Sequence, residues 1–278
     1  MARTDLTPRS SSRLQGIVIA QLASLVLFAC VSTIAPAASD VRAANRDALR
    51  QIVQEQCLVH WLQQHDPAPC ERIFLSDALH GTAGYAVLAD IKGGAHFLLI
   101  PTNTIAGMES PEVLEPQSPN YFAGAWQARD RVSAVLGHEV RRDEVGIAIN
   151  PQSARGQDQL HIHIECLGAA LHSALQRAAA RLHDAWLPIN LAGRQYQALR
   201  VTGENLDKTN PFILLAEGVP GAKQEMGAYT LLVTGMQFKD GPGFIVLTGK
   251  NVPGAETFLD STCAIAERNS RSLKAGAG

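Results

Sequence analysis

The stretch Gln157-Asp158-Gln159-Leu160-His161-Ile162-His163-Ile164-Glu165-Cys166 alternates polar and apolar residues through most of its length. Successive side chains of a β-strand point to opposite faces of a sheet, so this alternation predicts a strand over residues 157–166. One face would carry four polar side chains: Gln159, His161, His163 and Glu165. Two imidazoles and a carboxylate are costly to bury without partners. We therefore expect this face to border a cleft, while the apolar face packs on the core.

The composition is that of a globular protein of one or two domains. The chain has 278 residues, of which 46% are hydrophobic and 18% are charged, and its formal net charge is −2. Such a chain has no basic field that would attract a polynucleotide, so we expect no nucleic-acid partner. The oligomeric state does not follow from these properties.

An uncharged apolar segment sets the N-terminus apart. Residues 16–34 are long and apolar enough to span a bilayer, and basic residues precede them. The positive-inside rule then places the body of the chain across the membrane. We expect residues 1–39 to be a membrane anchor and residues 40–278 to be the exported part. The small residues that follow the segment leave a cleaved signal peptide as the alternative.

Four cysteines lie in the exported part, namely Cys57, Cys70, Cys166 and Cys263. An even number in an oxidising compartment favours disulfides, and four cysteines allow three pairings. A Cys57–Cys70 bond would close a short loop, which leaves Cys166–Cys263 to tie the C-terminal region to the end of the central strand. A zinc site is the alternative, although the sequence has no Cys-x-x-Cys motif.

The remaining pattern predicts an α+β fold. We expect helices over about residues 40–65, 120–136 and 169–187, and strands over residues 84–91, 95–101 and 145–150. The Gly-containing turn at 92–94 makes the first two strands a hairpin. A similar pair of strands at 228–233 and 244–247 suggests a decayed repeat, with a first half over about 40–190 and a second half over about 191–278.

The two histidines admit three chemical interpretations. They could bind zinc with Glu165 as a third ligand, or they could be structural. They could also perform nucleophilic catalysis, because a neutral imidazole attacks phosphorus and the phosphoramidate that forms is easily hydrolysed. The polar loop from Asn150 to Gly156 would supply backbone N–H groups for phosphate oxygens without a metal or another cofactor.

The passage from Asn150 to Gly168 resembles the histidine triad (HIT) superfamily of nucleotide hydrolases and transferases. In that family an Asn, a Gly and a His-x-His pair follow one another at the spacings of Asn150, Gly156, His161 and His163. The resemblance implies a HIT-like antiparallel sheet with flanking helices. It also implies that His163 attacks the α-phosphorus and that Asp90 holds the ribose hydroxyls.

Two departures from the family pattern concern Glu165, which stands where the family has a third His or Gln, and Thr104, which stands where it often has a His. The resemblance gives this set of site residues: His163, His161 and Glu165 as catalytic residues, and Asp90, Asn150, Gly156, Gln157 and Gln159 as substrate-binding residues. No metal ligand is expected. His161 is the second candidate for the attacking residue, because it becomes the middle member if the motif is counted from Gln159.

Further motifs resemble the bacterial CDP-diacylglycerol pyrophosphatase family. They are the apolar N-terminal segment, the pair Cys57 and Cys70, and residues 109–111, 126–130 and 211–220. This resemblance implies hydrolysis of CDP-diacylglycerol, a lipid-linked cytidine nucleotide, to CMP and phosphatidate. It also implies an anchor in the bacterial inner membrane with a periplasmic catalytic domain. The alternatives are a periplasmic nucleotide- or phospholipid-binding protein and a zinc-dependent phosphohydrolase.

Overall fold

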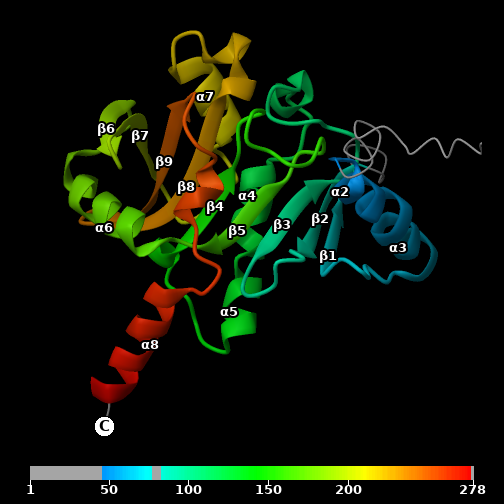
Figure 1. The fold of residues 1–278 in the computed structure, drawn as a ribbon, viewed down its shortest axis with the longest axis horizontal. Helices are drawn as coiled ribbons and strands as arrows, with labels where there is room; N and C mark the ends of the chain where they lie inside the picture. Colours follow the sequence, from blue (N-terminus) through cyan, green and yellow to red (C-terminus); the bar gives the residue numbers. More distant parts are fainter. Residues whose placement is uncertain (1–45, 77–82, 277–278) are drawn as a thin grey trace, which may run out of the picture. The chain divides into compact units, whose positions relative to one another are not determined.

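The computed structural model describes residues 46–76 and 83–276, and the strands in this part form one antiparallel sheet (Figure 1). Their order across the sheet is β1-β2-β3-β5-β4-β8-β9-β7-β6. The strands are β1 (Arg72–Leu75), β2 (Gly84–Ala89), β3 (Phe97–Pro101), β4 (Val145–Ile149), β5 (Ile162–Cys166), β6 (Leu187–Leu191), β7 (Arg194–Thr202), β8 (Tyr229–Phe238) and β9 (Gly241–Lys250). The predicted α+β class and the first hairpin, β2–β3, are confirmed.

Helices and short helical turns connect and cover these strands. They are α2 (Ala48–Gln51), η1 (Ile52–Cys57), α3 (Leu58–Gln64), η3 (Pro111–Leu114), α4 (Tyr121–Ala128), α5 (Asp130–Leu136), η4 (Arg142–Glu144), α6 (Ala169–Ala178), η5 (Ala179–Arg181), α7 (Pro211–Gly218), η6 (Ala222–Gln224), η7 (Met226–Ala228), η8 (Ala255–Phe258) and α8 (Ala264–Gly276). The first three are consecutive and form one helical segment over residues 48–64, which confirms this part of the helix predicted over about 40–65; residues 40–45 lie outside the described part.

Two predicted elements differ from the structure in their length. The helix expected over 169–187 ends at Ala178 and continues only as the turn η5, because Leu187–Leu191 alternates in burial and pairs with β7 as strand β6. The strand expected over 157–166 begins only at Ile162. Gln159 and His161 therefore belong to the segment that leads into β5.

The two faces of β5 have different surroundings. Ile162 and Ile164 are fully buried in the core that contains α4, as the alternating pattern predicts. His163 points to the opposite face. On the β1–β3 side of that face, the segment α2–η1–α3 covers the sheet, and its Val53 packs with Leu88 and Leu98 (Figure 1). The histidines thus lie next to the part of the sheet that α2–η1–α3 covers.

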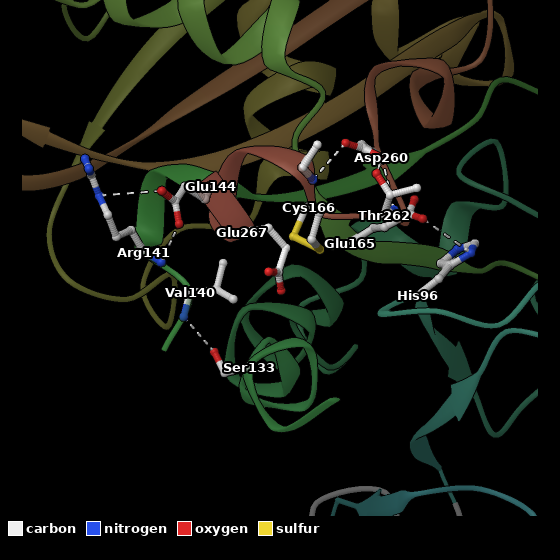
Figure 2. Close-up of a disulfide and its surroundings, with 12 residues drawn as sticks. His96, Ser133, Val140, Arg141, Glu144, Glu165, Cys166, Asp260, Thr262 and Glu267 are labelled. Carbon is white, nitrogen blue, oxygen red and sulfur yellow. Dashed lines mark hydrogen bonds and ion pairs between the residues drawn. A yellow bond between two sulfur atoms is a disulfide. The ribbon is translucent and has the colours of Figure 1, made fainter. Parts of the chain in front are cut away.

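Both predicted disulfides are present. Cys57–Cys70 joins η1 to the loop before β1, and Cys166–Cys263 joins the end of β5 to the residue before α8 (Figure 2). All four sulfurs are therefore engaged in disulfides, so the alternative of a zinc site built from these cysteines is wrong.

The predicted membrane anchor at residues 16–34 lies outside the described residues. Within residues 46–76 and 83–276, no helix is both long and apolar enough to cross a membrane. The boundary between an N-terminal segment and the catalytic part therefore stays a prediction.

Candidate active site

A cavity of about 880 Å³ lies between the segment α2–η1 and the ends of the central strands. Its polar lining is formed by Gln56, Asp90, Lys92, Asn150, Gln157, His161, His163 and Glu256, together with the backbone of Gly156. Its apolar lining includes Leu49, Ile52, Pro69, Leu88, Ile91 and Leu98. The cavity thus joins the two histidines and the polar loop, which the sequence predicts to act together, to an apolar wall.

His161 is held in one tautomer by the backbone. Its Nδ1 lies 2.7 Å from the carbonyl oxygen of Gln159, and because a carbonyl only accepts, Nδ1 must carry the proton. Burial lowers the pKa of the His161 imidazole, which favours the neutral ring. The lone pair of that ring is then on Nε2, for which no hydrogen bond is found among the described residues. His161 is therefore a neutral imidazole with a free lone pair at the cavity.

His163 has both ring nitrogens close to other side chains. Its Nδ1 lies 3.0 Å from Nε2 of His96, and the two rings are stacked. Its Nε2 is buried, lies 3.2 Å from Oε2 of Glu256 and forms no well-directed hydrogen bond with any described residue. Burial, followed by the neighbouring rings of His161 and His96, lowers the pKa of His163 well below its ordinary value. This ring is therefore neutral too, and its Nε2 is directed toward a carboxylate.

Two more carboxyl groups approach His96 from its other side. Asp90 Oδ1 and Glu165 Oε1 each lie 3.8 Å from His96 Nδ1, and Figure 2 shows Glu165 directed toward His96. Burial raises the pKa of Glu165 to about 7, although Lys92 opposes this. The Glu165 carboxyl group therefore exchanges a proton near neutral pH. It lies beside His96, which contacts His163.

The raised pKa of Glu165 predicts a pH-dependent stability. Its unfolded value is 4.5 and its folded value is about 7, so the stabilising proton is fully bound below about pH 4.5 and is lost as the pH rises through 7. We expect Glu165 to contribute a decrease of about 3 kcal/mol to the free energy of unfolding over this range, whereas the lowered pKa values of His161 and His163 act in the opposite direction. Replacing Glu165 by Gln should remove most of this decrease, as measured by urea unfolding at several pH values. The exposed Glu217→Gln is the control, and an unchanged pH profile in the Glu165 variant would contradict the prediction.

The polar loop is tied to two other parts of the site. Asn150 Oδ1 accepts a hydrogen bond from the backbone N–H of Glu256 at 3.1 Å. Gln157 Oε1 accepts one from the N–H of Leu49 at 3.2 Å. Gly156 is exposed and has open space where a side chain would lie. These three residues line the cavity as the sequence predicts, and two of them also hold its walls together.

Arg155 supports this loop from behind. Its side chain is almost fully buried, with Nη1 at 2.6 Å from Oε1 of Glu109 and Nη2 at 3.4 Å from Oδ1 of Asp158. Asp158 in turn pairs with Arg46 at 2.5 Å. Arg155 therefore stabilises the loop conformation and does not point its guanidinium group into the cavity.

Two of the predicted site residues do not line the cavity. Glu165 lies 3.8 Å from His96 Nδ1, and His96 in turn contacts His163. The side chain of Gln159 is fully buried and donates to the carbonyl oxygens of Pro101 and Asn103 at 3.0 and 2.8 Å. The contact between Gln159 and His161 is made by the backbone carbonyl oxygen of Gln159, which positions the His161 ring.

Three residues of the site were missed by the sequence interpretation: Lys92, which was assigned only to the turn between β2 and β3, His96 and Glu256. His96 directly precedes β3, which pairs with β5, so its position beside His163 follows from a strand pairing that the sequence pattern leaves open. Glu256 comes from η8 after β9, and no local motif marks it. Within the described ranges, no group of three or more His, Cys, Asp or Glu side chains is arranged to hold a metal ion.

Comparisons with known proteins agree in one description. A family model described as CDP-diacylglycerol pyrophosphatase matches residues 44–267. A protein of Yersinia pestis with the name CDP-diacylglycerol pyrophosphatase is 40% identical over 233 residues, which cover 81% of this chain and 87% of that relative. The matched region contains every residue of the cavity lining.

Proposed function

The chain belongs to the CDP-diacylglycerol pyrophosphatase family and is a hydrolase, and we propose that it cleaves CDP-diacylglycerol to CMP and phosphatidate through a covalent nucleotidyl-histidine intermediate. The observation that carries this route is the fixed tautomer of His161, which presents an Nε2 lone pair to the cavity. A neutral imidazole of this kind is a good nucleophile toward phosphorus.

The geometry supports His161, rather than His163, as the attacking residue. His163 stays the candidate that the motif spacing predicts. However, its Nε2 faces Oε2 of Glu256 at 3.2 Å, and a carboxylate at this distance favours a proton on Nε2 over a free lone pair for attack. A neutral His163 that accepts from His96 at Nδ1 would carry its proton on Nε2 and could donate it to a phosphate oxygen.

The proposed first step needs no proton transfer. His161 Nε2 attacks the phosphorus that bears cytidine, the new N–P bond forms, and the bond to the bridging oxygen breaks. Phosphatidate leaves as a phosphate anion, and the imidazole keeps its Nδ1 proton on the Gln159 carbonyl. In the second step water attacks the same phosphorus and releases CMP.

The other cavity residues have supporting roles in this proposal. Asp90 accepts from the N–H of Lys92 at 2.7 Å and borders the cavity, where it can contact the ribose hydroxyls. Asn150, Gly156 and Gln157 border the region where the phosphates would lie. Lys92 is the cationic side chain of the lining and can offset phosphate charge. Glu165 would tune the protonation of His96.

We also propose that the domain is HIT-like and consists of two decayed repeats. The order β2–β3, α4–α5, β4–β5, α6 is followed by β6–β7, α7, β8–β9, α8. Strands β4 and β8 pair in the middle of the sheet, and the corresponding strands follow outward on either side. This order supports matching β8–β9 with β4–β5, whereas the sequence similarity links β8–β9 to β2–β3.

The membrane-bound location stays a proposal as well. The two disulfides are typical of an oxidising compartment such as the periplasm, and a lipid-linked substrate favours an enzyme held at the membrane surface. We expect a chain in which a cleavable signal peptide replaces residues 1–39 to move from the membrane fraction to the soluble periplasmic fraction. Recovery of that chain in the membrane fraction would contradict the anchor.

Turnover in the presence of a chelator tests the proposed function. We expect the purified protein to release CMP and phosphatidate from CDP-diacylglycerol in mixed micelles, with a rate that EDTA changes by less than about twofold, because an imidazole nucleophile needs no Lewis acid. Loss of CMP release that zinc restores would favour the zinc-dependent phosphohydrolase. Tight CMP binding without any turnover would favour the binding protein.

A further inference from the structure

Glu256 lies in η8, outside the histidine motif, and borders the same cavity. Its Oε2 is 3.2 Å from His163 Nε2, a buried atom that forms no hydrogen bond with any described residue. The Glu256 side chain is 36% exposed, so water in the cavity can reach it. A water-accessible carboxylate therefore lies beside the catalytic histidines.

The backbone around Glu256 is fixed to the strands that carry the histidines. The N–H of Glu256 donates to Asn150 Oδ1, and Gly254 approaches Asn150 so closely that a Cβ atom would lie 2.5 Å from that oxygen. Beyond η8, the N–H of Asp260 donates to the carbonyl oxygen of Cys166 at 2.9 Å. The position of the Glu256 carboxylate is thus set from both sides by the segments that end β4 and β5.

The other two carboxyl groups near the histidines are less suited to accept a proton from water. The Asp90 side chain is only 10% exposed and accepts from the N–H of Lys92. The Glu165 side chain is 8% exposed, lies 3.8 Å from His96 Nδ1 and does not line the cavity. Glu256 combines exposure to the cavity with direct proximity to the histidine pair.

We propose that Glu256 is the general base that activates water for hydrolysis of the nucleotidyl-histidine intermediate, an inference that rests on the proposed covalent route. As the water oxygen bonds to phosphorus, one water proton moves to Glu256 and the P–N bond breaks. The bonding electron pair returns to the imidazole Nε2, and CMP is released. Glu256 later returns the proton to solvent. In the first step a neutral imidazole displaces an anionic phosphatidate, so no proton has to be moved. Glu256 is therefore needed as a base only in the second step, in which water must lose a proton.

Separate measurement of the two products tests this assignment. In a pre-steady-state experiment with Glu256→Gln and excess substrate, we expect a burst of phosphatidate at near wild-type rate, in an amount equal to that of the enzyme. CMP formation should be slower by about 10²–10⁴-fold, the usual contribution of a general base. Substrate labelled at the cytidine-bearing phosphorus should then give labelled protein that accumulates. Glu225→Gln, which alters a surface carboxylate paired with Lys250, is the matched control and should behave as wild type.

Chemical rescue separates a base from a merely structural residue. In Glu256→Ala, formate should accelerate the release of CMP from the labelled protein and leave the phosphatidate burst unchanged, because a small carboxylate can occupy the vacated space. Equal slowing of both products, or full activity of Glu256→Gln, would overturn the role of Glu256. A wild-type enzyme that hydrolyses the substrate without any labelled intermediate would overturn the base assignment together with the covalent route. A wild-type protein that releases no CMP would instead refute the proposed function.

Discussion

His161→Ala is expected to release CMP from CDP-diacylglycerol at least about 10⁴-fold more slowly than wild type, because loss of a nucleophile removes the whole covalent route. It should also form no labelled intermediate when the cytidine-bearing phosphorus is labelled. The physical basis is the 2.7 Å contact from Nδ1 to the Gln159 carbonyl, which leaves Nε2 as the attacking atom. Stopped-time assays of CMP release, followed by mass spectrometric mapping of the labelled residue, measure both effects.

His163→Ala provides the comparison that decides between the two histidines. We expect it to lose about 10²–10³-fold in rate, as removal of one transition-state donor does, and still to form the intermediate on His161. His183→Ala, a histidine whose half-exposed ring lies outside the cavity lining, should have wild-type activity. Label on His163 in the wild-type protein, or in the His161 variant, would show that the prediction from motif spacing was right and that the one from geometry was wrong.

Removal of the Cys166–Cys263 disulfide is expected to destabilise the protein by about 4–5 kcal/mol, because it opens a loop of nearly a hundred residues in the unfolded chain. The sequence separation is 97, against 13 for Cys57–Cys70. The chain-entropy argument gives about 3 kcal/mol for the shorter loop. Urea unfolding of Cys166→Ala/Cys263→Ala and of Cys57→Ala/Cys70→Ala, each compared with wild type, measures the two losses.

The two double variants are matched, because all four cysteines are buried. We also expect the Cys166 and Cys263 variant to lose more activity than the other variant. The Cys166–Cys263 bond holds the end of β5 to the segment that follows η8 (Figure 2), and η8 carries Glu256. A larger loss of stability in the Cys57 and Cys70 variant would contradict the role of loop length.

Local patterns were sufficient for much of the fold. Alternation around Ile162 and Ile164 predicted a buried strand, and the Gly-containing turn at 92–94 predicted the β2–β3 hairpin. The helical spacing in 120–136 predicted one helix, which the structure divides into α4 and α5, and α5 ends before Gly137, whose backbone is left-handed (φ 70°). The hairpin β6–β7 was missed, because β6 follows a helical run and its strand character depends on pairing with β7.

The sequence by itself determined the histidine pair and the polar loop at its spacing from that pair, because both depend on residues close together in the chain. It favoured the Cys57–Cys70 and Cys166–Cys263 pairing, which the structure confirmed. Tertiary structure decided the chemistry of the pair. The tautomer of His161 depends on the backbone carbonyl oxygen of Gln159, a residue that lies before the start of β5. The neighbours of His163 are His96 and Glu256, which come from distant segments. The spacing of residues in the sequence indicates which side chains share a face of a strand. It does not record which groups a folded chain brings against that face, and those groups decide where each proton lies.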